Sequence, residues 1–381
     1  MAGRSCDVIV VGAGIVGLAV SFRLAQAGLD VCILEAAAAP ATQATARSAA
    51  GVRVQFTEPV NVLLSKESIR EYRHLAEVVG ADSGYRPVGY LFLVPAGEEE
   101  TYRRALATQA RLGVRSQLLS LESAREIVDF EPRGLAFATW GPDDGVIDPH
   151  TTSYGYLQAA RRRGAGLFTE CELFEARRVS GSWLVRAGCG EFNAPALVNA
   201  AGAWAGEVAR RAGFELPVEP YRRMVFMTGP LQGARDKPLT VDVASGFYLR
   251  GEGERLLMGM SNPEEPAGFR EGMDWGWLEP TLQAGLARFP WLERAGLDRR
   301  ASWWGYYAIT PDHNPILGAM PGLEGWYNAV GFSGHGVQHA AAVGRAIAEE
   351  VVEGRARTID IDPLRYERFA GGAGLRERNI V

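Results

Sequence analysis

The residues best suited to chemistry in this sequence are three glycines and a glutamate near the N-terminus. Gly12, Gly14 and Gly17 follow an apolar run, and Glu35 ends a second apolar run about twenty residues later. The first glycine permits a tight turn, the second lets backbone approach a pyrophosphate, and the third lets the following helix pack closely on the strand. A carboxylate at Glu35 can accept hydrogen bonds from both hydroxyls of a ribose. The pattern predicts a site for FAD or NAD.

A second glycine-rich loop lies near the C-terminus. Residues 326–330 read as a buried strand, residues 331–336 (GFSGHG) as a turn, and residues 338–352 as an alanine-rich helix that Gly354 ends. This order of strand, glycine loop and helix repeats that of the N-terminus. Since the sequence contains no second GxGxxG, a protein that binds two nucleotides is disfavoured.

Hydrophobic periodicity predicts the elements that must position these loops. A stretch of small residues over 36–50 follows the second strand and would let backbone lie against a bulky ligand. Residues 225–260 alternate as several short strands and predict an antiparallel sheet. The remaining expected strands are 7–11, 31–34, 89–95, 167–174, 177–179, 183–187 and 196–204, the last ending in small residues. The remaining expected helices are 59–79, 98–113, 149–163, 205–212 and 277–289.

Composition limits the classes of function. With 381 residues, 47% of them hydrophobic, the chain can bury a large core and is long enough for two joined domains. Its net charge of −5 gives no electrostatic reason to expect nucleic acid. The four cysteines contain no CxxC pair, so neither a zinc site nor a disulfide framework is expected, and a cytoplasmic setting fits best. No apolar run is long enough to span a bilayer.

Five segments together resemble the D-amino-acid oxidase and sarcosine oxidase superfamily of flavoproteins: residues 7–35, 47–56, 197–204, 306–318 and 331–338. The resemblance extends over the whole chain. It is greatest to the branch of sarcosine oxidase, glycine oxidase and the proline dehydrogenase β-subunit, whose members share the GFSGHG loop. The resemblance implies an enzyme that uses FAD.

The implied fold is α/β, of the glutathione-reductase type of FAD fold. A Rossmann-like FAD-binding domain (residues 1–85, 146–214 and 318–381) is interleaved with an antiparallel-sheet substrate domain (residues 86–145 and 215–317). A nicotinamide enzyme would use one Rossmann core, whereas here a strand, glycine loop and helix recur at the far end of the chain. One elongated FAD contacting both ends accounts for this arrangement.

The resemblance also implies which residues contact FAD. Backbone N–H groups of the late loop and a helix N-terminus would stabilise negative charge on the reduced flavin. His335 either contacts the flavin or packs as a structural histidine. The matching positions are Gly12, Gly14, Ile15, Val16, Gly17, Glu35 and Ala36 at the ADP half, Arg47, Ser48 and Ala49 beside the pyrophosphate, Ala201, Gly202 and Trp204 packed near the cofactor, and Gly334, His335, Gly336, Val337 and Gln338 at the flavin.

Three positions depart from the sarcosine oxidase pattern. Gly305 stands where monomeric sarcosine oxidases have a flavin-tethering cysteine, so we expect non-covalent FAD. Gln338 replaces a lysine that helps to hold the substrate carboxylate, and its amide can donate hydrogen bonds but carries no charge. Leu257 aligns with the lysine that assists reaction with oxygen, which argues against rapid oxidase activity.

The candidate catalytic residues are Arg53, Tyr248, Tyr307 and Gln338. The fork of Arg53 suits a carboxylate, although the side chain could equally bond backbone carbonyls near the flavin. Tyr248 lies in the part of the family that covers the substrate, with Arg250 two residues on and therefore on the same strand face. Since neighbours on a strand face opposite sides, only one of Tyr306 and Tyr307 should reach the cavity, and Tyr307 aligns better. His313 and His339 flank the late glycine loop in the sequence, and both are expected to be structural.

The resemblance implies removal of a hydride equivalent from the carbon beside an amine nitrogen to flavin N5, after which water hydrolyses the imine. Sarcosine, glycine, proline, other N-alkyl amino acids and D-amino acids all fit as substrates, with oxygen, a quinone or a partner subunit as electron acceptor. Three alternatives remain: a flavoprotein β-subunit of a multi-subunit amine dehydrogenase, a hydroxy-acid or glycerol-phosphate dehydrogenase, and, more remotely, an FAD-dependent enzyme that modifies nucleic acid. A homo-oligomer and a hetero-oligomer are both compatible with the sequence.

Overall fold

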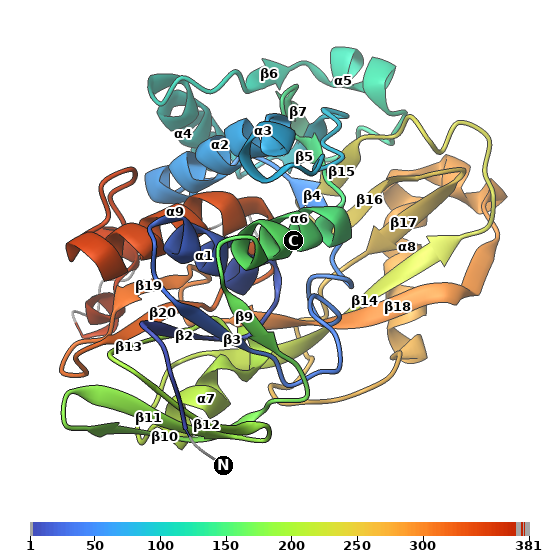
Figure 1. Ribbon diagram of the computed structural model, residues 1–381. Coiled ribbons are helices and arrows are strands. Elements are labelled where there is room, and N and C mark those ends of the chain that lie inside the picture. The colour runs from blue at the N-terminus through green and yellow to red at the C-terminus, as the bar shows by residue number, and fades with distance from the viewer. Residues whose placement is uncertain (1–2, 371–374, 376, 378–381) are drawn as a thin grey trace.

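The centre of the molecule is a six-stranded sheet in the order β19-β20-β13-β2-β3-β9 (Figure 1). The computed structural model describes residues 3–370, 375 and 377. All neighbouring strands are parallel except β19 and β20. The strands are β2 (Val8–Val11), β3 (Val31–Leu34), β9 (Gly166–Phe168), β13 (Ala196–Asn199), β19 (Ile316–Ala319) and β20 (Trp326–Val330).

Helices cover one face of this sheet (Figure 1). Helices α1 (Ile15–Gln26) and α9 (Gly336–Glu353) lie against its strands. Packed outside them are α2 (Pro59–Arg73), α3 (Leu75–Val79) and α6 (Pro149–Arg161). Val8 and Val10 of β2 pack into the same core as these helices, whereas Ile9 and Val11 pack into the core on the opposite face. Because β2 is buried on both faces, its sequence is a continuous apolar run rather than an alternating one.

An antiparallel meander of β10, β11 and β12 covers the opposite face. Strand β1 adds to the meander in parallel with β12. The elements of this layer are β1 (Arg4–Ser5), β10 (Leu173–Val179), β11 (Ser182–Ala187), β12 (Gly190–Ala194), the 3-10 helix η1 (Gly202–Trp204) and α7 (Ala205–Arg211). Trp183 and Trp326 pack edge to face, with centroids 5.1 Å apart, in the core between the two sheets.

A second large sheet has eight strands in the order β18-β14-β17-β16-β15-β5-β7-β6. Its pairs are antiparallel except for β15 and β5. The strands are β5 (Tyr90–Pro95), β6 (Gln117–Leu119), β7 (Leu135–Gly141), β14 (Glu219–Thr228), β15 (Leu239–Asp242), β16 (Phe247–Glu252), β17 (Arg255–Gly259) and β18 (Leu297–Ile309). The predicted antiparallel region thus joins strands from much earlier in the chain. The division into domains at the predicted boundaries stays a prediction.

Shorter elements complete the fold. Strands β4 and β8 pair as a small antiparallel ribbon, and Arg53 directly follows β4. These elements are β4 (Gly51–Val52), β8 (Gly145–Val146), α4 (Glu99–Arg111), α5 (Leu121–Ile127), α8 (Leu278–Arg288), η2 (Trp275–Trp277), η3 (Pro290–Arg294), η4 (Asp362–Leu364) and η5 (Tyr366–Phe369).

Several predictions about local structure, and one about cysteines, are wrong. The strand predicted over 167–174 is broken, since β9 ends at Phe168 and β10 begins at Leu173, and the strand predicted over 196–204 ends at Asn199. The helix predicted over 59–79 is interrupted at His74, whose φ of −122° is not helical. Cys171 and Cys189 form a disulfide, with Cα atoms 4.9 Å apart, although no disulfide was expected. The pairing follows from the turn between β11 and β12, which returns to the start of β10, and spacing in the sequence does not reveal it. The cytoplasmic setting stays a prediction, and its argument from cysteines no longer holds.

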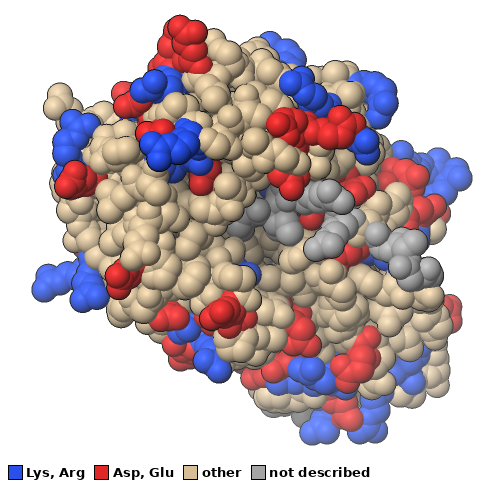
Figure 2. All heavy atoms as spheres, turned by 180° about the vertical axis from the view of Figure 1, so that it is seen from behind, with Lys and Arg blue, Asp and Glu red and all other residues tan. Residues whose placement is uncertain are grey.

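The surface and the helices add two observations. On the face shown in Figure 2, basic and acidic side chains are interspersed, without a broad region of one sign. Among the helices within the described residues, none combines the length and the apolar character that crossing a bilayer requires. The fold class predicted from the sequence is confirmed.

Candidate functional site

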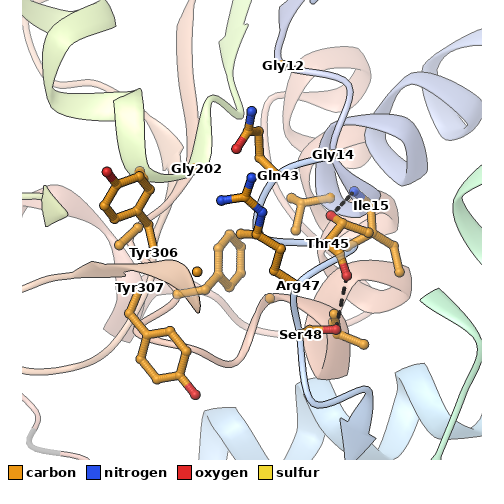
Figure 3. A pocket seen from close by; sticks show the side chains of 18 of the residues that line it. Gly12, Gly14, Ile15, Gln43, Thr45, Arg47, Ser48, Gly202, Tyr306 and Tyr307 are labelled. Carbon is orange, nitrogen blue, oxygen red and sulfur yellow. Dashed lines mark hydrogen bonds between the residues drawn. The ribbon is translucent and has the colours of Figure 1, made fainter. Parts of the chain in front are cut away.

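A cavity of about 510 Å³ lies where strands β2, β3 and β13 end and meets the eight-stranded sheet on its other side. Crevices at the carboxyl ends of parallel strands are the usual ligand sites of such sheets. Both glycine-rich loops line this cavity. The two loops, far apart in the sequence, therefore meet at one site, and Figure 3 shows Gly12 and Gly14 of the first loop at its edge.

Each of the three N-terminal glycines lacks a side chain for a different structural reason. Gly12 has a φ of +105°, and a Cβ there would lie 2.5 Å from the carbonyl oxygen of Ala200. A Cβ on Gly17 would lie 2.0 Å from the carbonyl oxygen of Gly12. At Gly14, by contrast, the nearest atom to an added Cβ is Thr45 Oγ1 at 3.4 Å. Gly12 and Gly17 close the turn, and Gly14 leaves space on the cavity side for a phosphate.

Glu35 is placed at the cavity edge directly after β3. Its Oε2 accepts a hydrogen bond from the N–H of Ala13 at 2.8 Å, and its Oε1 accepts one from the N–H of Ala37 at 2.9 Å. Each carboxylate oxygen has a second lone pair, and the residue lines the cavity. The carboxylate is thus held rigidly, with capacity left for two ribose hydroxyls.

The small-residue stretch after β3 forms one wall. Thr45 Oγ1 accepts from the N–H of Ile15 at 3.1 Å, which ties this stretch to the first turn of α1. Ser48 Oγ donates to the carbonyl of Thr45 at 3.0 Å. The Arg47 side chain projects into the cavity between Gly14 and Tyr306 in Figure 3, and its Cζ lies 4.6 Å from the centroid of the Trp304 ring. A guanidinium at this place suits a diphosphate.

The facing wall comes from the segment after β13. Gly202 has a φ of +56°, and a Cβ there would meet nothing within 4 Å. Trp204 stacks on Phe269, with centroids 5.1 Å apart, and meets Tyr306 edge to face. The open space beside Gly14 and Gly202, together with the acceptors of Glu35, fits the ADP half of FAD.

The late glycine loop packs against Tyr307, on the side of the cavity that the eight-stranded sheet forms. Gly334 has a φ of +94°, and a Cβ there would lie 2.4 Å from the ring of Tyr307. Helix α9 begins at Gly336, two residues before the predicted start, so its first turn lines the cavity. The N-terminus of a helix carries partial positive charge and favours an anionic ligand such as a reduced flavin ring.

Arg53 lies in this part of the cavity wall but is already engaged by the protein. Its guanidinium donates to the carbonyl of Gln55, lies 4.1 Å from the centroid of the Phe56 ring, and reaches His335 Nε2 at 3.5 Å. Its backbone N–H donates to Gln338 Oε1 at 3.1 Å. Burial and the nearby guanidinium together lower the pKa of His335 well below its usual value, so the imidazole is neutral.

A buried polar network supports Arg53 from behind. Asp144 accepts from the N–H of Val54 at 2.8 Å and from Gln55 Nε2 at 3.0 Å, and Thr139 donates to Gln55 Oε1 at 2.7 Å. Complete burial raises the pKa of Asp144 to about 7, and these hydrogen bonds oppose the rise. The network fixes the segment from Arg53 to Gln55 in one conformation.

Three tyrosines gather at the end of the cavity opposite Glu35. Tyr90, Tyr248 and Tyr307 all line it, and burial raises the pKa of each phenol, which keeps the hydroxyls protonated. The ring of Tyr248 lies over Gly259, where a Cβ would come within 2.4 Å of the hydroxyl oxygen. These hydroxyls can donate to or accept from a small polar ligand.

Most predicted site residues line the cavity, with two exceptions. Gly17 lies behind the turn, and Arg250 donates to the carbonyl of Ala49 and pairs with Glu252 instead of facing the cavity. The expectation that only one of Tyr306 and Tyr307 reaches the cavity is wrong: their side chains point in opposite directions, as Figure 3 shows, but the cavity extends past both. The predicted residues that do line it are Gly12, Gly14, Ile15, Val16, Glu35, Ala36, Arg47, Ser48, Ala49, Arg53, Ala201, Gly202, Trp204, Tyr248, Tyr307, Gly334, His335, Gly336, Val337 and Gln338. Their roles toward FAD and substrate stay predictions.

Sequence reasoning missed several lining residues. Thr45 gave no signal beyond its place in a small-residue stretch, and Tyr90 reads as an ordinary strand residue. Arg223 follows a second arginine on β14, and alternation along a strand shows that only one of the two faces inward without showing which. Cys171 lines the opposite end of the cavity and belongs to the disulfide.

The two large sheets and the glycine-lined crevice define an α/β fold of the class that binds dinucleotides. Residues 7–350 match the family described as FAD dependent oxidoreductase, and the chain belongs to this family. Its cofactor is therefore FAD, as predicted.

Comparison with known proteins agrees with this assignment. The chain is 32% identical to bovine (Bos taurus) FAD-dependent oxidoreductase domain-containing protein 1, over 98% of this chain and 87% of the relative. It is 28% identical to human (Homo sapiens) mitochondrial sarcosine dehydrogenase, over 92% of this chain and 40% of that protein. The crystal structure of L-proline dehydrogenase from P. horikoshii superposes with a TM-score of 0.90 at 29% identity, covering 98% of this chain and 100% of the other.

Proposed function

We propose that the protein oxidises the C–N bond of a small amino acid or secondary amine. The observation that carries the proposal is the pocket formed by Tyr90, Tyr248 and Tyr307 at the flavin end of a single cavity that both glycine loops line. A sarcosine dehydrogenase and an L-proline dehydrogenase among the similar proteins support this substrate class. Neither the hydroxy-acid nor the electron-relay alternative gains support from these proteins.

Bound FAD supplies the acceptor for two electrons from the carbon beside the amine nitrogen. The residues of the chain position the substrate and exclude water. Tyr248 and Tyr307 line the pocket from the eight-stranded sheet, and the loop around Gly334 packs directly against the ring of Tyr307. The neutral His335 and the engaged Arg53 hold this loop close to the segment after β4.

The test is anaerobic bleaching of the flavin absorbance by a panel of compounds. Sarcosine, L-proline, glycine and D-alanine represent amino acids, and L-lactate and glycerol 3-phosphate represent the alternative class. Bleaching by one or more of the amines, with formation of the imine-derived carbonyl product, is expected. Bleaching only by the hydroxy compounds would refute the proposal. Size-exclusion chromatography of the natively purified protein separates a free enzyme from a subunit of a larger complex.

We further propose that reduced enzyme reacts slowly with oxygen. No lysine lines the cavity within the described part of the chain, and Leu257 is buried in an apolar cluster with Tyr248. Stopped-flow mixing of reduced enzyme with air-saturated buffer should show slower reoxidation than mixing with a quinone or a dye. Rapid reoxidation with peroxide release would contradict this proposal.

The FAD is proposed to be non-covalent. Gly305 occupies the strand position beside Arg47, and the one cysteine among the lining residues, Cys171, is already bonded to Cys189. Acid precipitation should release all yellow colour into the supernatant. Colour retained in the washed pellet would indicate a covalent link.

A further inference from the structure

A glutamate near the C-terminus is buried beside the segment that follows Arg53. Glu377 has no exposed surface. Its Oε1 accepts hydrogen bonds from the backbone N–H and the hydroxyl of Thr57, at 3.0 and 2.8 Å. Its Oε2 accepts from the N–H of Glu58 at 3.2 Å and from Asn61 Nδ2 at 3.0 Å. Because a buried carboxylate is costly unless it is hydrogen-bonded and balanced by a positive charge, we expect a cation close to Glu377.

Glu377 is also joined to the segment that follows β18. Its backbone N–H donates to the carbonyl of Asp312 at 3.4 Å. The side chain of Asp312 in turn pairs with Arg368, with 2.7 Å between Oδ2 and Nε, and both side chains are largely buried. Since β18 carries Tyr307, Glu377 connects two segments that lead into the cavity, one after β4 and one after β18.

Arg53 supplies a positive charge on the cavity side of Glu377. Its side chain is 2% exposed, and its Cζ lies 4.1 Å from the centroid of the Phe56 ring and 5.2 Å from that of Phe92. Burial lowers the pKa of Arg53, and the negative charge of Glu377 opposes this shift. Burial raises the pKa of Tyr102, which Arg53 lowers and Glu377 raises further. Both charges therefore lie near the same phenol and can offset each other.

Arg53 in turn contacts the first turn of α9 and the residue before it. Its backbone N–H donates to Gln338 Oε1 at 3.1 Å, and its Nη2 lies 3.5 Å from His335 Nε2. Both partners line the cavity at the late glycine loop, where the flavin ring is predicted to lie. Thr57, which Glu377 holds, is four residues from Arg53. A change at Glu377 is therefore transmitted to the flavin end of the cavity through one short segment.

We propose that Glu377 is a positioning residue of the flavin site. It fixes the segment from Arg53 to Thr57 and offsets the charge of Arg53, which keeps His335 and Gln338 in place beside the flavin. Glu377 itself does not line the cavity, so it acts through Arg53. The inference depends on the flavin lying beside the late glycine loop and is independent of the proposed substrate.

The first test measures the two-electron potential of the flavin in the holoenzyme, by equilibration with a dye of known potential. Glu377→Gln removes a negative charge and should favour the anionic reduced flavin by roughly 3- to 10-fold. This corresponds to a rise of about 14 to 30 mV. Glu377→Asp keeps the charge and should stay within about twofold of the wild type. The matched control is Glu367→Gln, at an exposed glutamate of η5, which should not shift the potential.

The second test is a double-mutant cycle on the free energy of unfolding. Wild type, Arg53→Met, Glu377→Gln and the double variant are unfolded in urea as full-length protein after removal of FAD. Because the double variant contains no unbalanced charge at this place, Glu377→Gln should lower the folding equilibrium constant at least about tenfold less in the Arg53→Met background than in the wild type. A glutamate with a purely structural role would give equal losses in both backgrounds.

Each outcome supports or overturns the inference. Equal losses in the cycle would overturn it, and so would an unchanged or lowered potential in Glu377→Gln. If Glu377→Gln does not fold, the double variant decides: a folded double variant supports the offset of charges, and an unfolded one overturns it. Neither readout uses an amine. Failure of every amine to bleach the flavin would therefore refute the proposed function alone.

Discussion

At the scale of single residues, two carboxylates that line the cavity differ in what they contact. Glu35 accepts backbone N–H groups with both oxygens, whereas Glu172 pairs with Arg211 and its side chain is 49% exposed. Only the first is held rigidly against the ligand space. Replacing each glutamate by glutamine should therefore distinguish a direct contact with FAD from a general effect of removing a negative charge.

We predict that Glu35→Gln weakens FAD binding by about 10- to 100-fold, because the amide places an NH2 group against a backbone donor and removes a charged acceptor. The measurement is quenching of FAD fluorescence on titration of the apoprotein. Glu172→Gln is the control, with an expected change below about threefold because an exposed ion pair contributes little. Equal losses in both variants would argue against a specific ribose contact.

The second residue is His339 on α9, which affects how stability depends on pH. It is fully buried, and neither ring nitrogen has a hydrogen-bond partner among the described residues. Burial, with a contribution from Arg53, lowers the pKa of His339 to about 3. The unfolded chain binds a proton at this side chain near pH 6.5 while the folded chain does not, so stability falls as the pH drops from about 6.5 toward 3.

We predict that His339→Leu removes this acid sensitivity. Between pH 8 and pH 5, the wild type should lose about 2 kcal/mol more free energy of unfolding than the variant, because protonation of one histidine in the unfolded chain accounts for that amount. Urea unfolding of the holoenzyme at both pH values measures it. His74→Leu, at an exposed histidine, serves as control for the loss of an imidazole. Parallel pH profiles for wild type and His339→Leu would refute the assignment.

At the scale of elements, the packing of α1 on α9 holds the two glycine loops in register. Each helix begins at a cavity-lining loop, and they cross where Gly344 meets Ala19. A Cβ on Gly344 would lie 2.8 Å from the backbone carbon of Ala19. This close approach sets how far apart the helix N-termini lie, and thereby the space available for the cofactor.

We predict that Gly344→Ala destabilises the protein by about 1 to 3 kcal/mol, because the methyl group forces the helices apart. The same change in an exposed helix interior would stabilise by about 1 kcal/mol, so the sign of the effect is diagnostic. Val352→Ala, at a 49% exposed position of the same helix, serves as control. Chemical denaturation with parallel measurement of FAD content tests both, and a stabilised Gly344→Ala variant would contradict the packing argument.

At the scale of the whole molecule, the cavity exists because two sheets from interleaved segments meet. The segment that follows β3 begins with Glu35 and is hydrogen-bonded to the residues just before β10: the N–H of Cys171 donates to the carbonyl of Glu35 at 2.9 Å. The disulfide from Cys171 to Cys189 then connects this segment to the turn between β11 and β12. The cross-link therefore secures the end of the cavity that fits the adenosine.

We predict that the double variant Cys171→Ser/Cys189→Ser loses about 3 kcal/mol of stability, as expected for a loop closed over 18 residues. Its affinity for FAD should also fall. Wild-type protein treated with a thiol reductant should show the same loss, and the reductant should not affect the double variant further. Cys6→Ser, at a free cysteine, is the control. An unchanged melting temperature in the double variant would show that the bond does not hold this end.

The sequence by itself determined the dinucleotide site and the positions of both glycine loops, and its resemblance to a flavoprotein family indicated the fold class and FAD. The glycine pattern depends on local backbone chemistry: the positive φ of Gly12, the contact of Gly17 with Gly12 and the hydrogen bond from Ala13 to Glu35 all lie within one strand, turn, helix and strand, so spacing reveals them. Tertiary structure alone decided that Arg223 rather than Arg222 lines the cavity, that Arg53 is engaged by Gln55 and His335, and that Cys171 pairs with Cys189. These features depend on strand register and on contacts between separate elements, which no local pattern of residues encodes.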